Sequence, residues 1–146
     1  MQKVVKIENL AAMRAFANEM AKVLRNTPTV VALEGDLGAG KTTFTQALAA
    51  ALGVKRPVTS PTFTLVGEYS LPDGGRLVHM DLYRLKAATD LDALGFDEYL
   101  QSGDLICIEW PDRAEGALPS DTLHINIAIP EGNPDARIIT LTQAEA

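Results

Sequence analysis

Short apolar runs alternate with longer amphipathic segments along the chain. In the longer segments the apolar residues recur every three to four positions, which predicts helices, whereas the short runs predict strands. Such an alternation indicates an α/β fold, in which helices flank a sheet. The runs predicted as strands are residues 4–7, 29–35, 63–71, 76–81, 105–109, 123–129 and 137–142.

Two long helices are predicted in the N-terminal half. Asn9 can cap the first helix, which ends in the segment 26–28. The second helix covers residues 41–52, with Gly53 as its C-terminal stop. It is apolar on nearly all sides, so we expect it to be largely buried. The apolar face of the first helix comprises Leu10, Met13, Ala17, Met20, Ala21 and Leu24.

Turn residues between the predicted strands indicate two hairpins. Segments 72–75 and 130–135 combine proline, glycine and aspartate, the residues that tight turns favour. The run 29–35 is almost wholly apolar, as expected of a parallel strand that is buried on both faces. We therefore predict a mixed sheet, with a parallel core and antiparallel edge strands.

The composition of the chain favours one folded domain, residues 1–146. Hydrophobic residues make up 47% of the sequence, and no stretch is strongly biased. The net charge of -6 argues against a broad nucleic-acid surface, so we expect any nucleic acid to be reached through a partner. The single cysteine, Cys107, lies in an apolar run and is expected to be a buried thiol. No segment resembles a signal peptide or a membrane span, which favours the cytoplasm.

One segment carries a motif for phosphate binding. Residues 34–43 read EGDLGAGKTT, which satisfies G-x-x-x-x-G-K-[ST], the P-loop or Walker A pattern, between a predicted buried strand and a helix. Glycines allow backbone N–H groups to surround phosphate oxygens, and the following helix directs its positive end at the same anion. Lys41 adds a cation, and Thr42 can place its hydroxyl on a magnesium ion between the outer phosphates. The residues predicted to bind nucleotide here are Gly35, Asp36, Leu37, Gly38, Ala39, Gly40, Lys41, Thr42 and Thr43.

Two predicted strands end in carboxylates, Asp81 and Glu109. In open α/β sheets, ligands gather at the carboxyl ends of the strands, so both acids should reach the same crevice as the P-loop. One of them is expected to hold magnesium or its waters, and the spacing alone leaves open which. Trp110 directly follows Glu109 and is expected at the mouth of this crevice.

The segment 59–65 carries hydroxyl residues on both sides of a proline. A loop at this position could sense the terminal phosphate, with Thr62 or Thr64 as the contacting residue. The alternative is an ordinary Ser-Pro turn that enters a strand. The sequence leaves both interpretations open.

Several other features have plain structural interpretations. Residues 92–95 match the D-x-x-G of GTPase switches, but no strand precedes them, and a helix capping box of Thr89 and Asp92 explains the acid better. No Asn-Lys-x-Asp segment for guanine recognition occurs, so adenine is the expected base. His79 and His124 fall inside predicted strands without paired ligand spacing, and packed or surface imidazoles are expected.

Four segments together resemble the TsaE family, small bacterial ATPases of tRNA N6-threonylcarbamoyladenosine biosynthesis. They are, in family order, GDLGAGKTTF at 35–44, SPTFTLV at 60–66, HMDLYRL at 79–85 and IEWPDR at 108–113. The resemblance spans nearly the whole chain and implies a P-loop fold on a mixed sheet, with ATP as the ligand. It also implies action in a complex with the partner proteins TsaB and TsaD, in which TsaD performs the transfer onto tRNA, at the adenosine next to the anticodon.

The resemblance further implies roles for individual residues. Phosphate binding by residues 35–42, magnesium at Thr42 and Glu109, and a role in hydrolysis at Asp81 carry over from the family. The SPTF stretch, which contains Thr62, matches a switch-like loop of the family. Trp110 matches the family's tryptophan beside the metal-binding acid.

The sequence thus predicts a slow, partner-dependent ATPase that requires magnesium. In this hypothesis Lys41 stabilises charge on the γ-phosphoryl group, and Asp81 orients or deprotonates water. A small-molecule kinase is one alternative, with Arg84 or Arg113 as a clamp for the acceptor, although no insertion is long enough to form a lid. A nucleotide-gated assembly module with incidental turnover is another.

Overall fold

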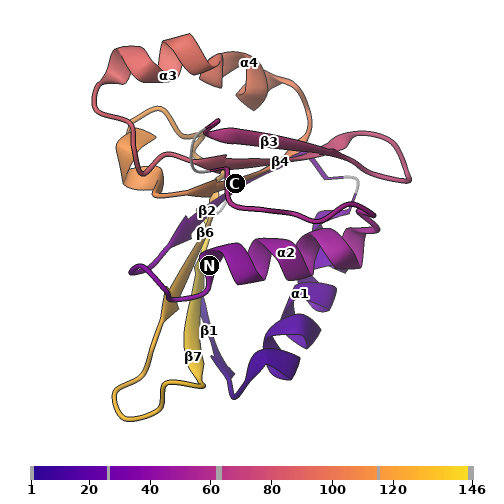
Figure 1. Cartoon of the computed structure of the whole chain (residues 1–146), viewed down its shortest axis with the longest axis vertical. Coiled ribbons are helices and arrows are strands. Elements are labelled where there is room, and N and C mark those ends of the chain that lie inside the picture. Colours follow the sequence, from indigo (N-terminus) through magenta and orange to yellow (C-terminus); the bar gives the residue numbers. More distant parts are fainter. Residues whose placement is uncertain (1, 26, 62–63, 115, 145–146) are drawn as a thin grey trace.

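In the part of the chain that the structure describes, seven strands form one mixed sheet, which confirms the predicted α/β fold (Figure 1). The structure is a computed structural model that describes residues 2–25, 27–61, 64–114 and 116–144. The strand order is β1-β7-β6-β2-β5-β4-β3. The strands are β1 (Gln2–Ile7), β2 (Thr29–Glu34), β3 (Val66–Ser70), β4 (Arg76–Asp81), β5 (Leu105–Glu109), β6 (Leu123–Ala128) and β7 (Arg137–Thr142).

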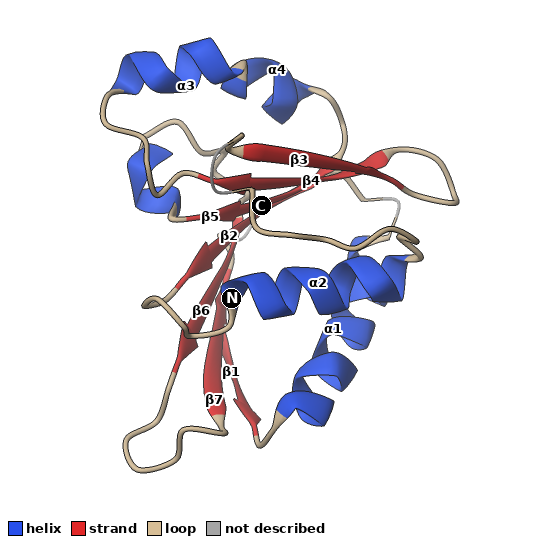
Figure 2. Ribbon diagram, in the orientation of Figure 1, coloured by secondary structure: helices blue, strands red, loops and turns tan. Residues whose placement is uncertain are grey.

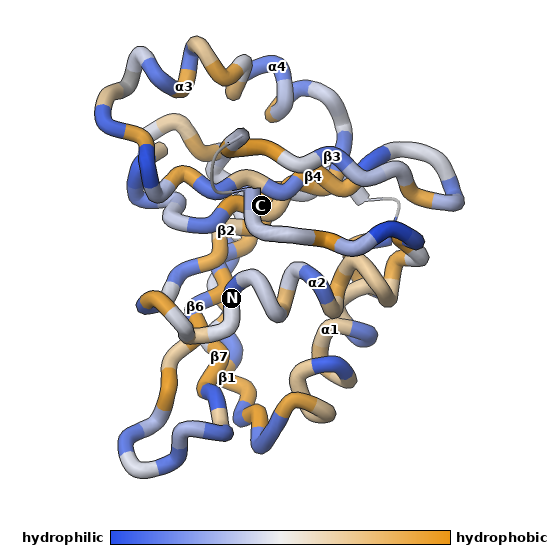
Figure 3. The backbone as a smooth tube through the Cα atoms, in the orientation of Figure 1, coloured by the Kyte–Doolittle hydropathy of each residue, from blue (hydrophilic) through white to orange (hydrophobic). Residues whose placement is uncertain are grey.

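Parallel pairs form the centre of the sheet and antiparallel pairs form its edges, as predicted. β2 pairs in parallel with both β5 and β6, and β4 pairs in parallel with β5. The hairpins predicted at 72–75 and 130–135 are confirmed, because these segments connect the antiparallel pairs β3–β4 and β6–β7. Figure 3 shows how the chain changes from hydrophobic strands to a hydrophilic turn in the β6–β7 hairpin.

Helices cover both faces of the sheet (Figure 2). The helices α1 (Leu10–Leu24) and α2 (Lys41–Leu52) pack on one face, and α3 (Ala88–Leu94) and α4 (Phe96–Gln101) pack on the other. A short 3₁₀ helix, η1 (Pro111–Ala114), follows β5. Because α2 joins β2 through the glycine-rich loop, its N-terminus lies at the carboxyl edge of the parallel strands. Among the described residues, none of the helices is long and apolar enough to cross a membrane.

The predicted start of α1 is confirmed, because the Asn9 side chain accepts a hydrogen bond from the backbone N–H of Ala12 at 2.9 Å. The predicted apolar face is buried with one exception. Leu10 is 51% exposed because it lies in the first turn, where it lines a surface cavity beside the β6–β7 hairpin. The prediction for α2 also holds, since Phe44 and Leu48 are fully buried against the sheet.

The start of α3 differs from the prediction. The carboxylate of Asp90 accepts hydrogen bonds from the backbone N–H groups of Lys86 at 3.0 Å and Ala87 at 3.1 Å, and these bonds lower its pKa. The predicted capping box of Thr89 and Asp92 is therefore wrong, because Asp90 makes the N-terminal contacts and the helix begins at Ala88.

The strand predicted at 63–71 is shorter in the structure. It begins at Val66, because Leu65 has a left-handed φ of 67° and its backbone N–H bonds to the carbonyl of Pro61. Phe63, at the start of the predicted strand, lies outside the described residues. Thr64 and Leu65 thus lie before the strand and not in it.

Candidate nucleotide-binding site

The loop between β2 and α2 turns through three left-handed glycines. Gly35, Gly38 and Gly40 have φ values of 147°, 81° and 115°, which L-residues with side chains rarely adopt. α2 begins at Lys41, directly after Gly40, without a side-chain cap on its first N–H groups. The loop therefore presents backbone N–H groups and a helix N-terminus, which together favour an anion.

The side chain of Lys41 lies inside this loop. Its Nζ donates a hydrogen bond to the carbonyl of Gly35 at 2.6 Å and lies 3.6 Å from the centroid of the Trp110 ring. Burial lowers the pKa of Lys41 from its ordinary value, while nearby carboxylates, Glu109 first among them, act in the opposite direction. The loop therefore holds a desolvated cation, which an incoming anion would stabilise.

Thr42 and Glu109 form a hydroxyl–carboxylate pair beside Lys41. The Thr42 hydroxyl lies 2.9 Å from Oε2 and 3.2 Å from Oε1 of Glu109, and Glu109 is only 4% exposed. Among the described residues, no group of three or more His, Cys, Asp and Glu side chains could hold a metal ion. Magnesium often takes only one or two protein oxygens and completes its shell with phosphate and water. The pair thus fits a magnesium ion that a nucleotide helps to hold.

Asp81 lies next to Glu109 across the sheet. The two acids end β4 and β5 and are register partners in the parallel pair. One oxygen of Asp81 accepts a hydrogen bond from the backbone N–H of Tyr83 at 3.0 Å, and the other accepts one from the Ser60 hydroxyl at 3.3 Å. The expectation that both acids reach the crevice of the P-loop is confirmed.

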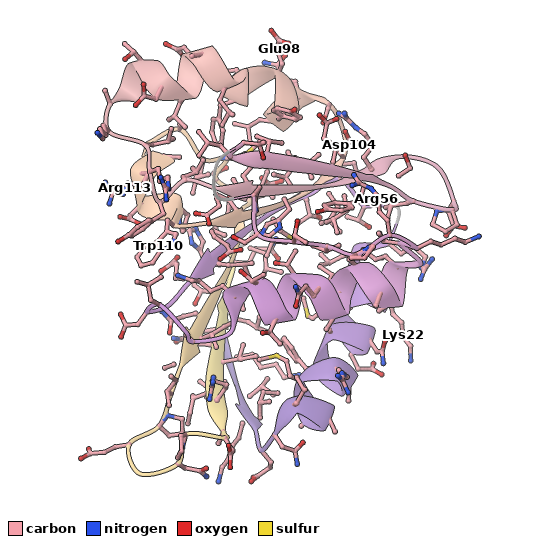
Figure 4. The ribbon with its side chains drawn as sticks, viewed as in Figure 1. Lys22, Arg56, Glu98, Asp104, Trp110 and Arg113 are labelled. Carbon is pink, nitrogen blue, oxygen red and sulfur yellow. The ribbon has the colours of Figure 1, made fainter. Side chains whose placement is uncertain are left out.

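A cavity of about 390 Å³ brings these side chains together. It is lined by Leu37, Gly38, Gly40, Lys41, Thr42, Thr43, Ser60, Asp81, Tyr83, Arg84, Glu109 and Trp110. Trp110, which was predicted at the mouth of the crevice, is one of the lining residues, and Figure 4 shows it near η1 and the loop between β2 and α2. The chemical roles of these residues stay predictions.

The other predicted loop residues line two adjoining cavities. Gly35 and Asp36 line one of about 800 Å³, which shares Lys41 and Trp110 with the first cavity. Ala39 lines another of about 350 Å³, which shares Gly40 and Thr43 with the first. Its remaining wall consists of Ile7, Asn9, Leu10, Met13, Pro134, Asp135 and Arg137.

Of the two candidate phosphate sensors in the segment 59–65, Thr64 does not line the 390 Å³ cavity. Thr62 lies outside the described residues. Thr64 is exposed, donates to the carbonyl of Val66 at 3.4 Å, and lines a different surface cavity along β3. The described residue of this segment that reaches the acids is Ser60, through Asp81.

Sequence reasoning missed the contact of His79 with the acid cluster. Its Nε2 lies 2.6 Å from Oε2 of Glu109, and the ring is fully buried. A signal was available, because His79 precedes Asp81 by two residues on one strand and so faces the same side of the sheet. His124 is instead half-exposed and pairs with Glu34, with 2.8 Å between Nδ1 and Oε1.

A glycine-rich loop connects the buried strand β2 to a helix, and the next two strands of the sheet, β5 and β4, end in acids. This arrangement defines an α/β protein with a P-loop NTPase-like fold. Within this fold class, one family model matches most of the chain. Residues 7–139 match the family model described as "Threonylcarbamoyl adenosine biosynthesis protein TsaE". The chain belongs to the TsaE family.

Similar proteins support this assignment over most of the chain. The tRNA threonylcarbamoyladenosine biosynthesis protein TsaE of Bacillus subtilis is 45% identical over 116 residues, which are 77% of this chain and 68% of that protein. The protein of the same name from Streptomyces coelicolor is 40% identical over 134 residues, 89% of each chain. The crystal structure of Bacillus subtilis YdiB superposes with a TM-score of 0.81 at 37% identity, covering 99% of this chain and 87% of that one.

Proposed function

We propose that the protein binds ATP with Mg²⁺ and hydrolyses it slowly in support of tRNA threonylcarbamoyladenosine biosynthesis. The observation that carries this proposal is the convergence of the P-loop with Asp81 and Glu109 on one cavity at the carboxyl ends of β2, β4 and β5. The biosynthetic role is supported by the names of the relatives from Bacillus subtilis and Streptomyces coelicolor.

The phosphates would occupy the 390 Å³ cavity. The N-terminus of α2 and the N–H groups of the loop would surround them, and Lys41 would exchange its bond to Gly35 for charge-assisted bonds to phosphate oxygens. These groups lie on a loop that is fixed at both ends by buried elements. The phosphates would therefore meet donors that are already oriented.

The nucleoside would occupy the adjoining cavity of about 350 Å³. This cavity shares Gly40 and Thr43 with the phosphate cavity, so a phosphate chain that passes Thr43 leads directly into it. Leu10 and Met13 give it an apolar wall, and Asp135 supplies hydrogen-bond acceptors. We expect adenine as the base, because the chain lacks an Asn-Lys-x-Asp segment.

Thr42 and Glu109 would hold the magnesium ion, which when bound neutralises charge that develops on the phosphates. Asp81 keeps lone pairs beyond those that bond to Tyr83 and Ser60, and these can accept a proton of a water molecule. Asp81 would orient this water or remove its proton, and Lys41 would stabilise the charge on the γ-phosphoryl group.

Partners are part of the proposal. We propose TsaB- and TsaD-type proteins as partners and cytoplasmic action, with tRNA reached through them, because the net charge of -6 disfavours direct binding of a polyanion. Hydrolysis should then be slow in the isolated protein and faster with the partners. The Ser60–Asp81 bond offers one route for such control, since it connects the segment before β3 to the acid cluster.

The deciding experiment has two stages. Isothermal titration calorimetry with ATP and GTP, each with and without Mg²⁺, should show magnesium-enhanced binding that favours ATP. Reconstituted tRNA modification should then be followed together with phosphate release, with and without the protein. Modification that needs the protein and consumes ATP supports the proposal.

Other outcomes would replace it. Transfer of phosphate to a small molecule would favour a kinase, for which Arg84 in the cavity wall could clamp the acceptor. Many rounds of modification without any hydrolysis would favour a nucleotide-gated assembly module. Absence of nucleotide binding in calorimetry would reject all three.

A further inference from the structure

His79 is a fully buried polar residue of β4. Its exposure is 0%, and Leu77, which lies two residues before it on the same face of the strand, is also fully buried. The cross-strand partner of His79 on β5 is Cys107, which is also fully buried. A polar ring in such surroundings costs stability unless its nitrogens are hydrogen-bonded.

Only one of the two ring nitrogens has a partner among the described residues. Nε2 lies 2.6 Å from Oε2 of Glu109, whereas Nδ1 is buried and makes no hydrogen bond. A leucine of similar size would avoid the cost of the unsatisfied nitrogen. The hydrogen bond to Glu109 is therefore the one polar interaction that a histidine gains over a leucine at this position, among the described residues.

The direction of this hydrogen bond follows from chemistry. A carboxylate that holds a metal ion is ionised and can only accept hydrogen bonds. In the role proposed for Glu109, the Nε2 atom of His79 is therefore the donor to Oε2.

The contact also distinguishes the two oxygens of Glu109. The Thr42 hydroxyl lies within hydrogen-bond distance of both oxygens, at 2.9 and 3.2 Å. His79 bonds to Oε2 alone. Thr42 by itself leaves the rotation of the carboxylate plane weakly defined, because its hydroxyl is close to both oxygens. A second donor, on one oxygen only, defines that rotation.

We propose that His79 is a positioning residue, which holds the carboxylate of Glu109 in one rotation, with Oε2 bonded to the imidazole and Oε1 left for the magnesium ion. This inference rests on the proposed function of Glu109 as a magnesium-holding acid. Partners of this kind orient metal-holding side chains, and their loss typically costs roughly 10- to 100-fold in metal affinity.

Paired substitutions in the full-length protein test this role. His79→Leu removes the donor at nearly constant volume, and His79→Gln keeps an N–H that can reach the same oxygen. Cys107→Ala is the matched control, because it perturbs the same buried spot on the neighbouring strand without removing a donor to Glu109. The measured quantity is the dissociation constant for ATP with Mg²⁺ and with a chelator, by calorimetry.

We expect His79→Leu to reduce the magnesium-dependent gain in ATP affinity by roughly 10- to 100-fold, while affinity in the chelator stays unchanged. His79→Gln should restore part of the gain, and Cys107→Ala should keep it even if it lowers the melting temperature. An equal gain in wild type and both His79 variants would overturn the proposal. So would a loss in Cys107→Ala as large as in His79→Leu.

A second measurement needs no nucleotide. Heteronuclear NMR of the imidazole ring should find the His79 proton on Nε2, slow to exchange with solvent. A ring with its proton only on Nδ1 would overturn the inference. Because this measurement uses the wild-type protein, it decides the question even if His79→Leu fails to fold. If the wild-type protein binds no ATP, the proposed function fails, and the NMR result still decides whether His79 donates to Glu109.

Discussion

Lys41 and Trp110 are in direct contact, with Nζ 3.6 Å from the centroid of the indole ring. The same nitrogen donates to the carbonyl of Gly35 at 2.6 Å, so Lys41 interacts with an aromatic face and a carbonyl at once. Trp110 has a left-handed φ of 57°, which is rare for a bulky residue. The ring thus stands over the P-loop lysine at the cost of an unfavourable backbone conformation.

The first prediction is that ATP changes the fluorescence of Trp110. A phosphate that bonds to Lys41 changes the charge distribution next to the indole, and Trp110 is the single tryptophan of the chain. Emission should change saturably as ATP is added and follow the binding curve from calorimetry. In Lys41→Met the change should be much smaller. If calorimetry detects ATP binding but the tryptophan emission stays constant over the same ATP titration, this prediction is wrong.

The second prediction concerns the charge of Lys41. Because burial lowers its pKa, the folded protein loses the Lys41 proton at a lower pH than the unfolded chain does. Between the lowered pKa and the ordinary value of 10.5 the unfolded chain binds more protons, so this residue makes stability rise with pH in that window. Below the window, the charged lysine destabilises the fold.

Lys41→Met should therefore melt at a higher temperature than wild type at neutral pH and lack this rise with pH. It should also bind ATP about 10- to 100-fold more weakly, because this is the loss in affinity expected when charge-assisted hydrogen bonds are removed. Lys55→Met, at an exposed lysine, is the control for loss of one positive charge. Thermal unfolding between neutral and alkaline pH, together with calorimetry, measures both effects. Equal melting curves for the two variants would be evidence against a desolvated Lys41.

The strand–loop–helix unit could be predicted from sequence because its determinants are local. The spacing of Gly35, Gly40 and Lys41 and the apolar run before them are contiguous, and so were readable without tertiary contacts. Hairpins at 72–75 and 130–135 were predicted for the same reason.

The features that the sequence did not predict depend on contacts between distant segments, or on a choice between neighbouring residues that could play the same part. Asp90 and Asp92 are both plausible capping acids, and only the path of the chain before α3 decides that Asp90 reaches two N–H groups. The contact of His79 with Glu109 joins two strands that are distant in sequence, so it needed the parallel pairing of β4 and β5. Leu65 reads as a strand residue but adopts a left-handed turn.

The third prediction separates two glycines of the loop. A Cβ at Gly35 would press against the carbonyl oxygen of Ile127, a backbone atom of β6 that cannot rotate away. At Gly38 nothing lies within 4 Å of such a Cβ, so only the left-handed φ opposes a side chain. Gly38→Ala should lower the free energy of unfolding by about 1–2 kcal/mol. Gly35→Ala should lower it by more than about 2 kcal/mol.

Urea unfolding of both variants checks this difference, and calorimetry follows the consequence for ATP. Because Gly35 begins the loop and accepts the Lys41 bond, we expect Gly35→Ala to weaken ATP binding more than Gly38→Ala does. Similar stabilities for the two variants would mean that the close approach of Gly35 to β6 does not constrain the loop.

The fourth prediction separates binding from hydrolysis at Asp81. Asp81→Asn keeps an oxygen for the Tyr83 N–H but removes the charge that can accept a proton from water. ATP affinity with Mg²⁺ should stay within about threefold of wild type, because in the proposed function Lys41 and the loop, and not Asp81, would supply the phosphate contacts. The rate of hydrolysis in the presence of partners should fall by about 100-fold or more, the usual contribution of a general base. Asp97→Asn, the same change at an exposed position on α4, controls for net charge. Single-turnover phosphate release measures the rate; a fall in affinity equal to the fall in rate would instead make Asp81 a binding residue, and an unchanged rate would remove it from the mechanism.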